Sequence, residues 1–153
     1  MKRLQKLKRL TEYLEAFRLP DWPEIVPVRV VDGENATSQL ARAAGDQVLA
    51  ALPQSREYGT DSDSFSGSLS TAFFVLAKIN GPARTAALAD ETYLRLLDVS
   101  QSILDRLTSD LAGGDVGAPC PLLAGLTLTD VEIIPEYSVF GGWSGWSIEV
   151  TFS

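Results

Sequence analysis

The chain has 153 residues, of which 45% are hydrophobic and 22% are charged, so it is long enough to bury a core and too apolar to be disordered. It contains no histidine and one cysteine, which excludes His-dependent catalysis, histidine-ligated zinc and a disulfide framework. The net charge is −7, although five of the thirteen basic residues lie among the first nine, so the remaining body is strongly acidic. Such a body argues against general nucleic-acid binding, which depends on Lys and Arg contacts to phosphate.

Residues 1–19 are predicted to form an amphipathic N-terminal helix that stops at Pro20. Its apolar residues recur at three- and four-residue steps, which places them on one stripe: Leu4, Leu7, Leu10, Leu14 and Phe17. We expect this stripe to pack on the domain's own core or on a neighbouring subunit. The basic cluster on the same helix consists of Lys2, Arg3, Lys6, Lys8 and Arg9. It is either a solvated helix start or a contact for an anionic partner or a membrane surface. Its charges leave no apolar run for a secretory signal or a membrane span.

The next segment is predicted to hold one strand and one helix. Ile25–Val31 is rich in β-branched residues, and Pro27 removes a backbone donor, so we expect a short strand at the edge of a sheet. From Ser38 to Leu52 apolar residues recur every four positions, which favours a second helix that Pro53 ends. Residues 54–64 show no periodicity and are predicted to form a flexible loop.

The middle of the chain is predicted to hold a long strand and a long helix. In residues 65–79 one face is apolar throughout, whereas the other begins with serines and becomes apolar past Thr71, as in a strand that is covered on both faces only at its end. The longest helix is expected over 83–111, with a left-handed stop at Gly113-Gly114. Residues 112–124 are predicted to form a second flexible loop.

Two strands complete the chain. Leu126 and Leu128 share one parity whereas Val131 and Ile133 share the other, so a β-bulge is expected near 129–130. The final run 146–153 alternates strictly between apolar and polar residues, as in a strand with one buried face. The element order is therefore α-β-α-β-α-β-β. This order predicts one α+β domain over residues 1–153, in which a mostly antiparallel sheet of about four strands packs against helices on one face.

Motifs that would carry catalysis or bind a metal or cofactor are incomplete. Asp61-Ser62-Asp63 resembles the start of a calcium loop, but the required glycine and the distal acid are missing. The segment 142–146 resembles a nucleophile elbow, but Trp146 replaces its last glycine and no histidine is present to act as base. We therefore predict no enzyme activity, no cofactor and no metal. Trp143, in the turn before the last strand, is either a core residue or an anchor for a protein contact.

The order and character of the elements over roughly residues 65–153 resemble a viral family. A long apolar strand (STAFFVLAKI), a long helix (ADETYLRLLDVSQSILDRL) and a final alternating strand (GWSGWSIEVTFS) follow one another. This arrangement is similar to that of the tail terminator or tail-completion (minor tail or neck) proteins of tailed bacteriophages. The resemblance implies a small α+β structural protein of the virion, assembled in the host cytoplasm as a homo-oligomeric, usually hexameric, ring.

The resemblance also implies partners. Such a ring would cap the tail tube protein, join it to the head-completion or connector protein, and let DNA pass through its pore without binding, away from any membrane. The basic cluster and Trp143 are the candidate interface residues. Two alternatives stay open: a monomeric cytosolic adaptor that uses the tryptophan turn, and a carboxylate-dependent hydrolase built on Asp61 and Asp63.

Overall fold

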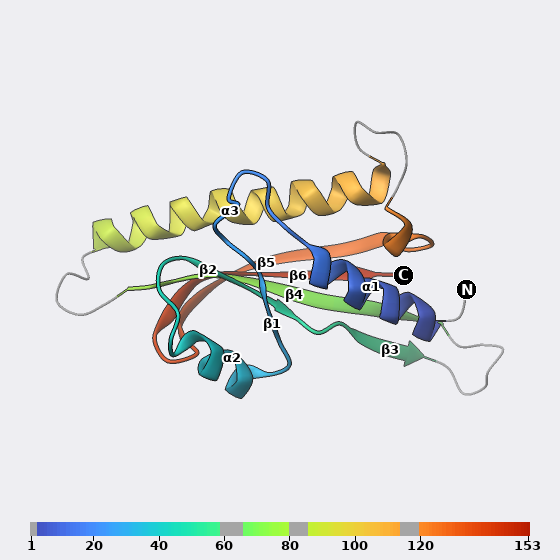
Figure 1. Cartoon of the computed structure of the whole chain (residues 1–153), viewed down its shortest axis with the longest axis horizontal. Coiled ribbons are helices and arrows are strands. Elements are labelled where there is room, and N and C mark those ends of the chain that lie inside the picture. Colours follow the sequence, from blue (N-terminus) through green and yellow to red (C-terminus); the bar gives the residue numbers. More distant parts are fainter. Residues whose placement is uncertain (1–2, 59–65, 80–85, 114–119) are drawn as a thin grey trace.

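The described part of the chain forms an α+β fold in which three helices pack on a mixed sheet of six strands (Figure 1). The computed structural model describes residues 3–58, 66–79, 86–113 and 120–153. The helices are α1 (Arg3–Ala16), α2 (Gly33–Leu40) and α3 (Ala86–Ala112), and a short 3₁₀ turn, η3, spans Pro121–Leu123. The strands are β1 (Val28–Val30), β2 (Gln47–Ala51), β3 (Gln54–Tyr58), β4 (Ser66–Lys78), β5 (Leu128–Val139) and β6 (Trp143–Phe152).

The strands lie in the order β1-β2-β4-β6-β5, and β3 pairs with β4 on the side that β2 also uses. The β1–β2 pairing is parallel, and the other four described pairings are antiparallel. β2 pairs with Phe73–Leu76 of β4 and β3 pairs with residues 66–70, so β2 and β3 follow each other along one side of that long strand. At one end of the sheet the spatial order is therefore β3-β4-β6-β5, which leaves β3 and β5 as opposite edges (Figure 1).

The prediction of a helix over 38–52 is wrong, and so is the loop over 54–64 in its first half. α2 begins earlier, because the Asp32 carboxylate caps the helix by accepting the Asn35 N–H at 2.8 Å, and it ends at Leu40. Gly45 then adopts a positive φ of 76°, and the chain continues into β2 and β3. The expected sheet of about four strands therefore has six. The edge position predicted for the first strand is confirmed, since β2 is the one described strand with which β1 pairs.

One face of the sheet carries the larger core. α1 and α3 cover it, and the stripe of α1 packs there through Leu10, Leu14 and Phe17, each no more than 3% exposed. The expectation that the stripe docks on the domain's own core is thus confirmed for these residues. Ile148, Val150 and Phe152 of β6 face the same core, as their alternation predicted.

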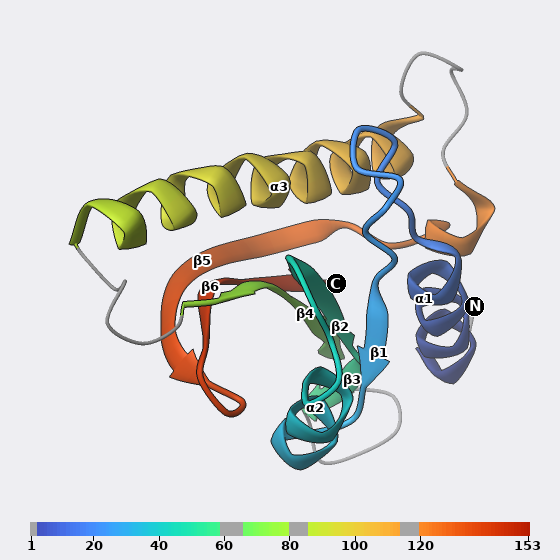
Figure 2. The same ribbon diagram turned by 60° about the vertical axis from the view of Figure 1, so that its left-hand side comes forward.

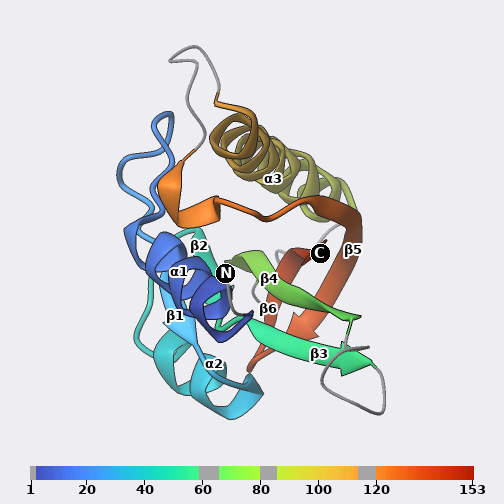
Figure 3. The same cartoon turned by 90° about the vertical axis from the view of Figure 1, so that its right-hand side faces the viewer.

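The opposite face is covered only in part, which corrects the prediction of helices on one face. α2 packs on this side through Ala36 and Leu40, against Leu49 of β2 and Leu76 of β4. Figure 2 shows α3 and α2 on opposite sides of the strands. In the end view of Figure 3, α3 lies above the strands and α1 lies beside them. Beyond α2, no described helix covers the rest of this face.

Two local predictions are confirmed in the C-terminal half. The β5–β6 register shifts between Leu128 and Asp130, where the bulge was expected. Gly113 ends α3 with a φ of 94°, the left-handed conformation that such helix ends favour. The loop predicted over 112–124 contains η3, whereas Gly114 and the rest of 114–119 lie outside the described residues.

Candidate assembly surfaces

The basic cluster of α1 is only partly available as a contact surface. Lys8 is exposed and Arg9 is half-buried, whereas Lys6 bends back within the chain and donates from Nζ to the carbonyl oxygen of Gly125 at 3.1 Å. Lys2 and the side chain of Arg3 lie outside the described parts of the structure. The structure therefore leaves Lys8 as the most accessible described member of the cluster.

Trp143 is buried, which corrects its assignment as an interface anchor. Its side chain is 2% exposed and packs with Val30, Leu49, Leu76 and the α2 residues on the second face of the sheet. By register Trp143 lies opposite Lys78, at the end of β4 that α2 covers. Trp146, which the alternation placed at the core, is half-buried and packs against the larger core, so that prediction is confirmed. Its indole N–H donates to the carbonyl oxygen of Tyr93 at 2.9 Å.

A polar network joins α1 to α3 and shows that α1 is an integral part of the fold. The Tyr13 hydroxyl donates to Oδ2 of Asp110 at 2.6 Å, and Arg106 donates to the same oxygen at 3.1 Å. Burial, and secondarily the hydrogen bond to Asp110, raise the pKa of Tyr13 well above its ordinary value, so this hydroxyl stays protonated across the physiological range. The network is structural, because Tyr13 is only 5% exposed.

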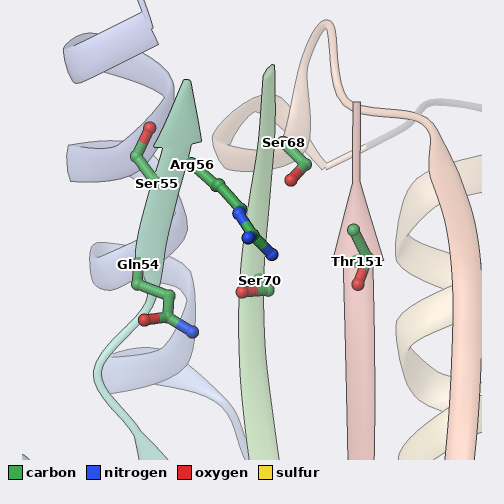
Figure 4. Close-up of a pocket in the computed structure, with 6 residues that line it drawn as sticks. All are labelled: Gln54, Ser55, Arg56, Ser68, Ser70 and Thr151. Atoms are coloured by element: carbon green, nitrogen blue, oxygen red, sulfur yellow. The ribbon is translucent and has the colours of Figure 1, made fainter. Parts of the chain in front are cut away.

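The open part of the second sheet face forms a shallow polar groove of about 480 Å³ (Figure 4). It crosses β3, β4 and β6, and we call it the polar face; its residues are Gln54, Arg56, Ser68, Ser70 and Thr151. The Arg56 side chain lies across β4 above Ser70 in Figure 4. Glu149 of β6 lines the neighbouring hollow on the same face. The polar face therefore offers hydroxyl groups and one guanidinium, and the neighbouring hollow adds the Glu149 carboxylate.

The most exposed apolar surface lies along β5. All but four of its twelve residues are exposed, and it forms one end of the strand order. Val131 and Ile133 are 36% and 40% exposed, and by register they share the α3 side of the sheet with Pro135. We call these three residues the β5 strip. Large exposed apolar side chains mark interaction sites more often than a single scattered leucine does.

A groove of about 390 Å³ continues the β5 strip toward α3. Tyr93 and Leu94 of α3 line it together with Pro135 and Trp146 of the two strands. Leu94 is 65% exposed, and the rings of Tyr93 and Trp146 meet edge to face at 5.8 Å. The Tyr93 hydroxyl donates to the carbonyl oxygen of Glu136 at 2.6 Å, which fixes one wall of the groove against β5.

The acidic residues of β5 point to the other face. Asp130 and Glu132 pair in register with Thr151 and Glu149, so they extend the polar face to the edge of the sheet. Both are exposed. Glu136 is half-buried and accepts a hydrogen bond from the Ser147 hydroxyl at 2.9 Å. β5 thus combines an apolar side, an acidic side and an edge with which no other described strand pairs.

The described residues offer little for catalysis. No three His, Cys, Asp or Glu side chains within the described ranges come together as metal ligands. Ser144, in the segment that resembles a nucleophile elbow, is fully buried and its hydroxyl accepts the Ser138 N–H at 3.0 Å. Asp61 and Asp63, the basis of the hydrolase alternative, lie outside the described residues.

Comparison of the sequence with protein-family models and with curated proteins found no match. Within the described part of the chain, the helices are too short or too polar to cross a bilayer.

The β5 strip is the feature that the sequence interpretation missed. The sequence pattern places Val131 and Ile133 on one side of the strand, and an apolar alternation of this kind usually indicates the side that faces the core. The available signal was the acidic alternation of Asp130, Glu132 and Glu136 together with Pro135, since charges and proline are typical of edge strands.

Proposed function

We propose that this protein is a structural subunit that assembles with copies of itself into a ring, in the manner of a phage tail terminator or tail-completion protein. In this role it stops growth of the tail tube and joins the tube to the head connector. It is not an enzyme, and it works in the virion after assembly in the host cytoplasm.

The exposed edge strand β5 is the observation that carries the proposal. Between the bulge at Thr129 and Pro135, β5 has an edge with which no other described strand pairs, and such an edge beside an apolar side is a template for pairing with another chain. The β5 strip and the adjoining groove supply apolar area on which a protein neighbour gains from the hydrophobic effect. If the subunit acts only in an assembly, a neighbouring subunit would cover the β5 edge, the β5 strip and the groove that are exposed in the single chain.

The polar face suits the passage of DNA. Among its described residues the polar face has one basic side chain, Arg56, and the carboxylates of Glu149, Glu132 and Asp130 lie on the same side of the sheet. Affinity for DNA grows with the number of phosphates that Lys and Arg neutralise. A pore wall with this composition would let the duplex slide.

The adaptor alternative loses its specific support, because it relied on Trp143 as an exposed anchor and that side chain is buried.

Tube capping tests the proposal directly. Tube protein from the same phage is polymerised with and without the purified chain, and tube lengths are measured by electron microscopy. We expect the chain to bind tube ends and to shorten the length distribution. An equally acidic unrelated protein of similar size is the control. Unchanged tube lengths, with no density at tube ends, would contradict the proposal.

A further inference from the structure

We propose that the β5 edge of one copy pairs with the β3 edge of the next copy, so that the sheet continues from subunit to subunit. This inference rests on the proposed function and names the two surfaces that would build the ring. The occupant of the β5 edge is therefore a second copy of this chain, in a head-to-tail contact. Contacts of this kind, which join different patches, close into rings when the rotation permits.

The backbone of β5 directs its unused groups outward at a defined stretch. Thr127 and Ser153 exchange two hydrogen bonds, of 3.2 and 2.9 Å, and bonded and non-bonded pairs alternate from there along β6. By this alternation Val131 and Ile133 turn their N–H and C=O groups away from β6, toward the free edge. Pro135 has the same parity, so it offers no donor there.

The bulge and the proline limit the part of β5 that can pair with another strand, and this part has the same length as β3. Between the bulge at Thr129 and Pro135 lie the five residues 130–134, and β3 also has five residues. Among the described strands, β3 pairs only with β4, so its other side is an edge. The two edges are therefore of equal length at opposite sides of one sheet.

Strand direction agrees with the pairing. β5 and β4 are both antiparallel to β6, and β3 is antiparallel to β4, so β3 runs opposite to β5. A rotation about an axis roughly along the strands leaves these directions unchanged. The β5 edge of one copy would then meet β3 of the next copy in an antiparallel pair.

Charge selects β3, and not a second β5, as the partner. A two-fold β5–β5 contact would place Asp130 and Glu132 of two copies on the same face of one ladder, and like charges opposite each other are destabilising. In the β5–β3 pairing Arg56 lies on that face, because it is in register with Ser68 of the polar face. Arg56 then meets the carboxylates of Asp130 and Glu132 across the junction.

Two variants separate the two edges. Ile133→Pro removes the outward N–H of β5 without removing a bond to β6, and Ile133→Ala is its matched control because it keeps that N–H. Arg56→Glu places an acidic group of β3 opposite the carboxylates of β5. Circular dichroism and thermal melts verify that each variant folds. Native mass spectrometry of the full-length chain then gives the assembly state relative to the 16.5 kDa monomer.

We expect Ile133→Pro and Arg56→Glu each to be monomeric, or to associate at least about tenfold more weakly than the parent. An equal mixture of the two should give a dimer and nothing larger, because each variant keeps one intact edge. Arg56→Glu combined with Glu132→Arg should restore assembly.

Different results overturn different claims. Homodimers of Arg56→Glu would indicate the two-fold β5 contact and overturn the inference. Rings of parental size in Ile133→Pro would overturn the edge pairing and leave the proposed function intact. A parent chain that stays monomeric, both free and with tubes, would overturn the proposed function itself.

Discussion

Replacement of Trp143 by alanine distinguishes a core residue from an interface anchor. The side chain is 2% exposed and fills the space between α2 and the second face of the sheet. Truncation of a buried Trp costs about 3–5 kcal/mol, from the lost transfer energy and the cavity left behind. That loss is a large share of the roughly 5–15 kcal/mol by which a domain is stable.

Urea unfolding at neutral pH measures this effect. We expect Trp143→Ala to lower the midpoint with little change in slope, and to lower the melting temperature by roughly 6–12 °C for a loss of about 3 kcal/mol. Leu4→Ala is the control: it truncates an apolar residue that is 76% exposed, so its effect should stay within about 0.5 kcal/mol. If Trp143→Ala loses less than about 1 kcal/mol while assembly fails, the residue is an interface anchor and the reasoning from burial is refuted.

Three further predictions concern a glycine, a tyrosine and a pair of aspartates. Gly145→Ala should destabilise by about 3 kcal/mol, because the new Cβ would collide with the backbone oxygen of Val75 in β4. Gly142→Ala is the control for backbone strain, since Gly142 has a φ of 105° and its Cβ would meet nothing within 4 Å; equal losses in the two variants would contradict the collision. Above pH 10 the unfolded chain releases the Tyr13 proton whereas the folded chain keeps it. The unfolding free energy of the parent should therefore fall with pH more steeply than that of Tyr13→Phe, by up to about 1.4 kcal/mol per pH unit; parallel pH profiles of the two proteins would contradict this. Asp61→Asn with Asp63→Asn should leave the melting temperature unchanged with and without calcium, whereas a calcium-dependent rise confined to the parent would indicate a site.

The elements that the sequence predicts well are those whose burial follows from their own periodicity. The stripe of α1 and the alternation of β6 each present one apolar side, and both pack as expected. The bulge beside Thr129 was predictable because the apolar parity changes there. In these cases local pattern and tertiary packing agree.

The errors arise where a neighbour in space decides the structure. Residues 48–50 are three buried positions of a central strand, and the apparent four-residue period from Leu40 to Leu52 is a coincidence of spacing. β3 has no apolar alternation and exists through its pairing with β4. Trp143 shares its parity with the open polar side of β6, and only the position of α2, which the sequence did not reveal, makes it a core residue.

The mass and shape of the purified full-length chain test the central claim most directly. Native mass spectrometry, with electron microscopy of the same sample, should show a closed ring whose mass is a whole multiple of 16.5 kDa and which has a central hole. Its stability should fall with added salt, because the pairing of Arg56 with Asp130 and Glu132 is exposed to solvent. A chain that remains monomeric at every concentration, or that stops at a two-fold dimer, would contradict the account.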